Sequence, residues 1–243
     1  AHIPGAIHAD LDHDLSAHGV ADAASGGRHP LPRREVFAHW LRQIGLRTDT
    51  QVVGYDRNGL NFCGRLWWML KWAGHEAVAV LDGGLAAWMA SGGAVENGPA
   101  KPRAPSDWTF QPPLRELVIA ADVLAHLDQP DQTLIDARAA PRYRGEVEPL
   151  DPVAGHIPGA LNRPFGLNLD EQGRFKPADT LRAEFEALLA GRDPASVVHQ
   201  CGSGVSALPN LLAMEVAGFA PTRLFAGSWS EWCRDPSRPV AKG

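Results

Sequence analysis

The chain has 243 residues, a formal net charge of −5, and 44% hydrophobic and 21% charged residues. This composition is ordinary for a globular protein of one or two domains, and the acidic balance gives no reason to expect nucleic acid as a partner. The most apolar stretch is interrupted by Lys71, so no membrane span is expected. The N-terminal sequence lacks the features of a signal peptide, and three cysteines are too few for a disulfide framework. We therefore expect a reducing, cytoplasmic location.

The first half of the chain alternates patterns that are typical of helices and strands. Its apolar spacing predicts helices over 33–45, 59–74 and 85–92, and strands over 50–56 and 77–83. Cys63 falls within the second of these helices and is expected to be a packed core residue. The same expectation applies to the tryptophans at helical spacing in both halves of the chain, which are Trp67, Trp68, Trp72, Trp88, Trp229 and Trp232.

A segment dense in proline, 98–116, follows the first half. Proline fixes φ and removes a hydrogen-bond donor, so this segment is predicted to be an extended linker that crosses between two domains over the surface. The linker divides the chain into an N-terminal domain, 1–97, and a C-terminal domain, 117–243.

The second half repeats the alternation. It predicts strands over 132–138, 196–200 and 222–227, and helices over 121–127, 177–191, 207–218 and 228–233. Short buried strands that alternate with helices indicate an α/β fold, with a mainly parallel sheet covered by helices on both faces. Ligands of such sheets bind beyond the carboxyl ends of the strands.

The two halves also match each other in sequence. Three blocks recur in the same order: HIPGAI (2–7) as HIPGAL (156–161), VVGYDRNG (52–59) as VVHQCGSG (197–204), and LDGGLAAW (81–88) as FAGSWSEW (225–232). Three collinear blocks indicate two homologous domains. The second copy has a helix and a strand before its HIPGAL block, and we expect their counterparts to be missing from the first copy.

Cys201 directly follows a predicted strand and precedes a predicted helix, with Gly202 and Gly204 around it. Backbone N–H groups converge in such a loop, and the helix start adds partial positive charge, so the thiol is expected to exist largely as the reactive thiolate. A buried structural cysteine is the alternative. A phosphatase loop would need arginine where Ala207 stands. A cysteine–histidine protease would need His199, which is more simply a packed strand residue.

The chain resembles the tandem rhodanese-domain sulfurtransferases over essentially its whole length. The motifs that carry the resemblance are the loop CGSGVSA (201–207), the paired HIPGA motifs, DGG in the first copy and GSWSEW in the second. The loop matches the CGSGVT of the mercaptopyruvate-using members rather than the basic CRKGVT of the thiosulfate-using ones. The resemblance implies two rhodanese-like domains, of which only the second carries the nucleophile. Asp56 stands at the matching position of the first.

The resemblance also implies a reaction and its residues. Cys201 takes sulfur from 3-mercaptopyruvate as a persulfide, releases pyruvate, and passes the sulfur to cyanide or to a thiol acceptor such as thioredoxin, without a cofactor or a metal. Ser203, Asp12 and His29 are the further catalytic residues. Arg142 grips the substrate carboxylate, and the remaining implied substrate-binding residues are Gly202, Gly204, Val205 and Ser206.

One position departs from the family pattern. Leu150 occupies the place of a second substrate-binding arginine, which leaves the donor in question. Arg144 is a possible substitute, whereas Arg138 is equally well explained as a structural ion-pair partner. Two alternatives therefore stay open: a thiosulfate-preferring enzyme, and a non-catalytic sulfur-carrier or interaction module. Cys233 is expected to have only a packing role.

Overall fold

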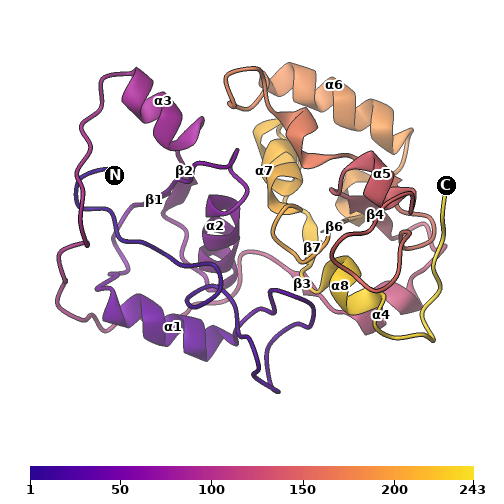
Figure 1. The fold of residues 1–243 in the computed structure, drawn as a ribbon, viewed down its shortest axis with the longest axis horizontal. Helices are drawn as coiled ribbons and strands as arrows, with labels where there is room; N and C mark the ends of the chain where they lie inside the picture. Colours follow the sequence, from indigo (N-terminus) through magenta and orange to yellow (C-terminus); the bar gives the residue numbers. More distant parts are fainter.

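The computed structural model describes residues 1–243 and contains two separate parallel sheets, one in each half of the chain (Figure 1). None of its helices is both long and apolar enough to span a membrane. The elements of the N-terminal half are α1 (Arg34–Gln43), β1 (Val52–Gly54), α2 (Cys63–Trp72), β2 (Val78–Val80) and α3 (Gly84–Ala90). Those of the C-terminal half are β3 (Leu117–Val118), α4 (Ala120–Ala125), β4 (Thr133–Asp136), α5 (Ala140–Tyr143), β5 (Leu161–Asn162), η1 (Phe165–Asn168), α6 (Ala178–Leu189), η2 (Pro194–Ser196), β6 (Val197–Gln200), α7 (Leu208–Val216), β7 (Arg223–Phe225) and α8 (Ser228–Trp232).

The C-terminal sheet has five parallel strands in the order β3-β7-β6-β4-β5. From β4 the chain continues to one edge of the sheet, and from β6 it continues toward the other. The loops that follow these two central neighbours therefore diverge, which is the arrangement that opens a ligand site in α/β sheets. Cys201 follows β6, and the segment with α5 follows β4.

Helices cover both faces of this sheet, as the sequence predicts. Leu134, Val198 and Phe225 pack on one face with the tryptophans of α8 and with α4. Ile135 and Val197 pack on the other face with α6 and α7. They directly neighbour Leu134 and Val198 in the sequence, so adjacent strand residues face opposite sides of the sheet. Strands buried on both faces explain the continuous apolar runs in the sequence.

The N-terminal half is built around α2, which packs beside a two-stranded parallel sheet of β1 and β2 (Figure 1). Trp67 and Trp68 of α2 belong to a core that also contains Leu208 and Leu211 of α7. A β-carbon on Gly64 would lie 3.1 Å from Cβ of Leu208, so glycine allows α2 and α7 to approach closely. The two halves therefore share a hydrophobic core beneath the Cys201 loop.

Two expectations about tryptophan and the linker need correction. Trp88 is half-buried rather than part of the core, and its indole donates to the carbonyl of Ala94. The segment 98–116 has almost no regular structure, but it does not run wholly over the surface, because Trp108 is 2% exposed and packs in the core of the N-terminal half. A large apolar side chain within the linker anchors it against the first domain.

Candidate active site

The loop after β6 places one backbone donor against the sulfur of Cys201 and leaves other backbone donors of the same loop unpaired. The Gly204 N–H donates to Sγ of Cys201 at 3.2 Å. The N–H groups of Gly202, Ser203, Val205 and Ser206 make no hydrogen bond within the protein. Unpaired amides at such a junction favour an anion. Gly204 has φ +74°, and a β-carbon there would lie 2.1 Å from the carbonyl oxygen of Ala226, so only glycine fits.

The start of α8 fixes the backbone of this loop. The Trp229 N–H donates to the carbonyl of Cys201 at 3.0 Å, and the Ser230 N–H donates to that of Gly202 at 2.9 Å. The Cys201 N–H donates in turn to Oγ of Ser228 at 3.1 Å. The carbonyl groups of Cys201 and Gly202 therefore face α8, and the N–H groups of the loop that lack partners stay available to a ligand.

All three cysteines are free and buried, and Cys201 is 1% exposed. Burial raises the pKa of the thiols of Cys63 and Cys233, which therefore stay protonated, in agreement with their predicted packing roles. A cavity of about 830 Å³ lies in the N-terminal half and is lined by Asp56 and Cys63 among others, but it does not include Cys201.

The structure brings together three of the residues that the resemblance implies. Nδ1 of His29 lies 2.7 Å from Oγ of Ser203, and Nε2 of His29 lies 3.5 Å from Oδ1 of Asp12. Asp12 is mostly exposed and also pairs with His18 at 3.2 Å. Burial and the positive charge of Arg65 lower the pKa of His29, so its imidazole is neutral at pH 7.

Arg65 of α2 is a residue that the sequence reasoning missed. Its guanidinium is fully buried and donates to the carbonyls of Leu15 (3.1 Å), His29 (2.9 Å) and Gly204 (3.1 Å). Burial lowers its pKa to about 9, which leaves it charged at pH 7, while a negative charge on Cys201 acts in the opposite direction. The signal was available, because helical spacing puts Arg65 on the face of Trp68.

Arg142 lies at the mouth of the Cys201 loop. Its Nη2 donates to Glu148 at 2.7 Å and lies 3.4 Å from Asp151. Its Nη1 has no partner within the protein, and it would lie 3.5 Å from a β-carbon placed on Gly202. Burial acts to raise the pKa of Glu148, but the hydrogen bonds from Arg142 and from the Leu150 amide lower it overall, so Glu148 is a carboxylate.

The other two arginines of this segment have separate roles. Arg138 is buried against Asp136 at 2.6 Å and lies over the Trp229 ring, which is the structural ion pair considered above. Arg144 pairs with Glu146 at 2.7 Å on the surface, so its guanidinium is not directed at the Cys201 loop. Leu150 is 60% exposed.

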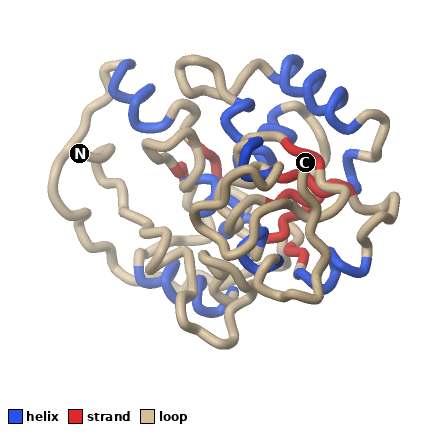
Figure 2. The backbone as a smooth tube through the Cα atoms, turned by 45° about the vertical axis from the view of Figure 1, so that its right-hand side comes forward, coloured by secondary structure: helices blue, strands red, loops and turns tan.

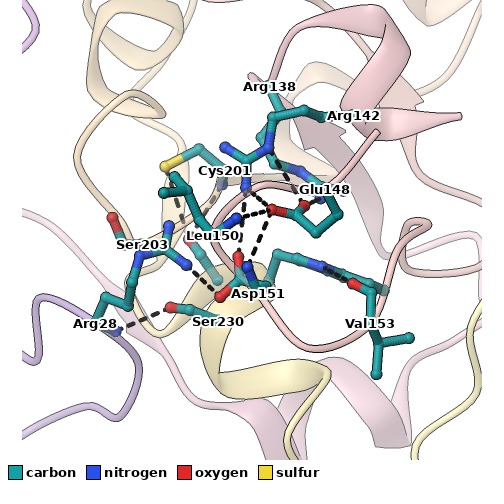
Figure 3. Close-up of polar contacts among 12 residues, drawn as sticks. Arg28, Arg138, Arg142, Glu148, Leu150, Asp151, Val153, Cys201, Ser203 and Ser230 are labelled. Atoms are coloured by element: carbon teal, nitrogen blue, oxygen red, sulfur yellow. Dashed lines mark hydrogen bonds and ion pairs between the residues drawn. The ribbon is translucent and has the colours of Figure 1, made fainter. Parts of the chain in front are cut away.

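A second arginine at the mouth comes from the N-terminal half. Arg28 pairs with Asp151, and Figure 3 shows Asp151 between the guanidinium groups of Arg28 and Arg142. A β-carbon on Gly202 would lie 3.0 Å from Nη2 of Arg28. The sequence reasoning missed Arg28, since nothing in a loop between Gly27 and His29 indicates a contact more than a hundred residues away.

Two further expectations concern His199 and metal binding. His199 is fully buried in β6, and neither ring nitrogen has a hydrogen-bond partner, which confirms it as a packed strand residue. Burial lowers its pKa to about 3, so it carries no charge at neutral pH. No group of three or more histidine, cysteine, aspartate or glutamate side chains is arranged to hold a metal ion.

Comparison with known proteins places the chain in a family. The Rhodanese-like domain model matches residues 1–91 and 119–235. A protein of Pseudomonas aeruginosa named probable 3-mercaptopyruvate sulfurtransferase is 53% identical over all of this chain and 84% of its own length. A Mycobacterium tuberculosis protein named putative thiosulfate sulfurtransferase SseB is 41% identical over the same shares.

A solved structure gives the same result. The crystal structure of SseA from Escherichia coli, described as a 3-mercaptopyruvate enzyme, is 36% identical in sequence. It superposes with a TM-score of 0.76 over 95% of this chain and 84% of SseA. The α/β fold, the duplicated domains and these relatives agree, and the chain belongs to the tandem rhodanese-domain sulfurtransferases.

Proposed function

We propose that this sulfurtransferase takes sulfur from 3-mercaptopyruvate as a persulfide on Cys201. One observation carries the proposal: Sγ of Cys201 lies at the end of a central strand, within a loop that offers one N–H group bonded to the sulfur and further unpaired backbone N–H groups. These donors would stabilise a thiolate before the reaction and a persulfide anion after it. Gly202, Gly204, Val205 and Ser206 would act through this backbone, because their side chains add no polar contact to the sulfur.

In the first step, the Cys201 thiolate attacks the sulfur of the donor. An S–S bond forms as the C–S bond breaks, and the electron pair of the C–S bond stays on the three-carbon fragment as an enolate. The proton of the donor thiol passes to the methylene carbon of the enolate, which leaves as pyruvate. Ser203 would relay that proton, and its contact with neutral His29, which lies beside Asp12, supports this role.

In the second step, an acceptor thiolate or cyanide attacks the outer sulfur of the persulfide. The S–S bond breaks, and its electron pair returns to Cys201. Reduced thioredoxin would suit this role as a dithiol, and three free cysteines are consistent with a reducing, cytoplasmic location. We also propose that the chain divides into domains at 1–97 and 117–243 with the linker 98–116 between them.

Intact mass after incubation with 3-mercaptopyruvate tests the chemistry. One added sulfur would raise the mass by roughly 32 Da. Cys201→Ser should abolish the gain, while Cys63→Ser, which removes another buried thiol, should keep it. Retained mass gain in Cys201→Ser would place the nucleophile elsewhere.

A thiosulfate donor is the rival, and two observations favour it. Leu150 stands where a second substrate-binding arginine was expected, and the Mycobacterium tuberculosis relative is named for thiosulfate. Steady-state rates with both donors distinguish the two: a large advantage of thiosulfate would overturn the choice of 3-mercaptopyruvate. A non-catalytic sulfur carrier is less consistent with the chain, because such a module does not need the nucleophilic loop that Cys201 retains.

A further inference from the structure

We propose that Arg65, a buried residue of α2, is a positioning residue for sulfur transfer at Cys201. Its guanidinium holds the loop after β6 so that the Val205 amide faces the anionic sulfur, and its positive charge balances that anion. The proposal rests on the proposed function, since it takes Cys201 to be the residue that carries the sulfur. It goes further by giving the N-terminal half a part in stabilising that sulfur.

The guanidinium of Arg65 joins three segments of the chain. It donates to the carbonyl of Gly204 in the loop after β6 at 3.1 Å, and to those of His29 at 2.9 Å and Leu15 at 3.1 Å. His29 and Leu15 belong to residues 1–33, which precede the first helix and run as a long loop (Figure 2). One buried side chain therefore holds this loop and the nucleophile loop against α2.

The contact with Gly204 also sets the direction of the next amide. All peptide bonds of the chain are trans. In a trans peptide the carbonyl and the N–H of the same unit point in opposite directions. The Val205 N–H, which has no partner within the protein, therefore points away from Arg65. Arg65 thus fixes the direction of one of the unpaired donors of the loop.

The start of α8 holds two other peptide units of this loop in the same manner. The N–H groups of Trp229 and Ser230 donate to the carbonyls of Cys201 and Gly202. The amides that follow these carbonyls, on Gly202 and Ser203, also have no partner within the protein. Two backbone donors of α8 and one side chain of the N-terminal half therefore hold three carbonyls and leave the three following amides available to an anion.

The charge of Arg65 has no carboxylate partner. The other two buried arginines each pair with a carboxylate, Arg138 at 2.6 Å and Arg163 at 2.7 Å, whereas Arg65 makes hydrogen bonds only to backbone carbonyls. A buried charge is costly unless an opposite charge compensates it. Burial lowers the pKa of Arg65 to about 9, and a negative charge on Cys201 opposes that change, so the two groups attract each other. The anionic sulfur is therefore the counter-charge of this guanidinium.

Single-turnover persulfide formation in Arg65→Gln and Arg65→Lys tests the proposal, with intact mass as the readout and with 3-mercaptopyruvate and thiosulfate as separate donors. Loss of the charge and of the held carbonyl should slow persulfide formation roughly 10- to 100-fold in Arg65→Gln with either donor. The donor concentration that gives half the maximal rate should change little, because Arg65 is buried beneath the loop. Arg65→Lys, which keeps the charge without the planar guanidinium, should lie between the wild type and Arg65→Gln.

Arg163→Gln is the matched control, because Arg163 is a buried arginine whose side chain bonds to Asn168 and Glu184 rather than to the Cys201 loop. It should lower Tm without slowing persulfide formation in the folded protein. Equal slowing in Arg65→Gln and Arg163→Gln would make Arg65 a structural residue only and overturn the proposal.

The two donors separate the remaining outcomes. Slowing with 3-mercaptopyruvate alone would place the effect on His29, since release of sulfite from thiosulfate needs no proton transfer to carbon, and it would overturn the role of Arg65 at the sulfur. A wild type that gains mass only with thiosulfate would overturn the proposed donor, and the thiosulfate rates would then decide the role of Arg65. No mass gain with either donor would overturn the proposed function itself.

The Val205 amide offers a second measurement that needs no variant of Arg65. In isotope-labelled wild-type protein, the NMR resonance of its amide proton should move downfield when the persulfide forms, because the N–H then donates to an anionic sulfur. An unchanged Val205 resonance beside shifted resonances of Gly202 and Ser203 would show that the peptide held by Arg65 does not face the sulfur. That result would overturn the proposal even if neither Arg65 variant folds.

Discussion

The two halves of the chain carry the same loop in two different electrostatic states. After β1, the Asp56 carboxylate accepts four backbone N–H groups, at 2.7 to 3.1 Å, from Asn58, Leu60, Phe62 and Cys63. After β6, Sγ of Cys201 accepts one, and the N–H groups of Gly202, Ser203, Val205 and Ser206 are among those left unpaired. The Asp56 carboxylate thus serves as a permanent anion in the loop after β1, whereas the N–H donors of the loop after β6 remain available to a ligand.

This difference supports the proposal that only the C-terminal half carries the catalytic loop. A carboxylate held by four donors is a fixed structural group, and it has no reason to exchange them during a reaction. A sulfur atom in a loop with unpaired donors can gain a second sulfur and lose it again while the loop stays in place. The N-terminal half instead contributes side chains that reach the second loop, which are Arg28, His29 and Arg65.

The largest effect is expected from Cys201→Asp, which gives the second loop the anion of the first. Sulfur transfer should fall by at least about a thousandfold, since a carboxylate cannot form a persulfide. The free energy of unfolding should be higher than that of Cys201→Ser, because the carboxylate can accept the unpaired N–H groups. Turnover and urea denaturation of the two variants measure this. A Cys201→Asp protein less stable than Cys201→Ser would contradict the account of the loop.

The converse change, Asp56→Ala, removes the built-in anion from the first loop. Four N–H groups lose a charged acceptor, so the free energy of unfolding should fall by about 2–3 kcal/mol. Persulfide formation at Cys201 should persist in the folded fraction. Asp49→Ala is the control, because that carboxylate is exposed and pairs only weakly with Arg47 at 3.5 Å. Equal stability of the two variants would mean that the Asp56 hydrogen bonds contribute little.

Much of the fold was predictable from the sequence, since it depends on local periodicity. The predicted strands and helices are all present, and Cys201 follows β6 as expected. The strands β3 and β5 were not predicted, because they have two residues each and form only through pairing with β7 and β4. Trp108 was not predicted as core, because proline composition describes backbone stiffness and not what a side chain packs against.

The residues of the candidate site can likewise be divided into those that the sequence predicted and those that it did not. The sequence and its family resemblance indicated Cys201, Ser203 and His29, and the structure brings His29 and Ser203 into contact. Arg28 and Arg65 were missed, because a charged residue is usually solvated. Helical spacing with Trp68 was the available signal for Arg65, whereas only a distant contact makes Arg28 part of the site. No local pattern encodes an ion pair between residue 28 and residue 151.

An effect confined to acidic pH concerns the strand beneath each loop, where Gly54 of β1 corresponds to His199 of β6. The folded protein keeps His199 neutral down to a pKa of about 3, whereas an unfolded chain protonates it near its ordinary value of 6.5. Below that value the unfolded state binds more protons, so stability is lost as the pH falls, by up to about 1.4 kcal/mol per pH unit from this group.

His199→Leu should remove this contribution, so the free energy of unfolding should fall less steeply between pH 6.5 and pH 4. At pH 7.5 the stability should be kept or raised, because both buried ring nitrogens of His199 lack partners. Urea denaturation across that pH range measures it, with His39→Leu as the control on an exposed helix position. An unchanged dependence of the free energy of unfolding on pH would mean that His199 is protonated in the folded protein. Because β6 is buried on both faces, that would require water to enter the sheet. The Cys201 loop would then follow a strand that contains a charged, hydrated side chain. Such a result would contradict the description of His199 as a neutral packed residue at the position of Gly54 in β1.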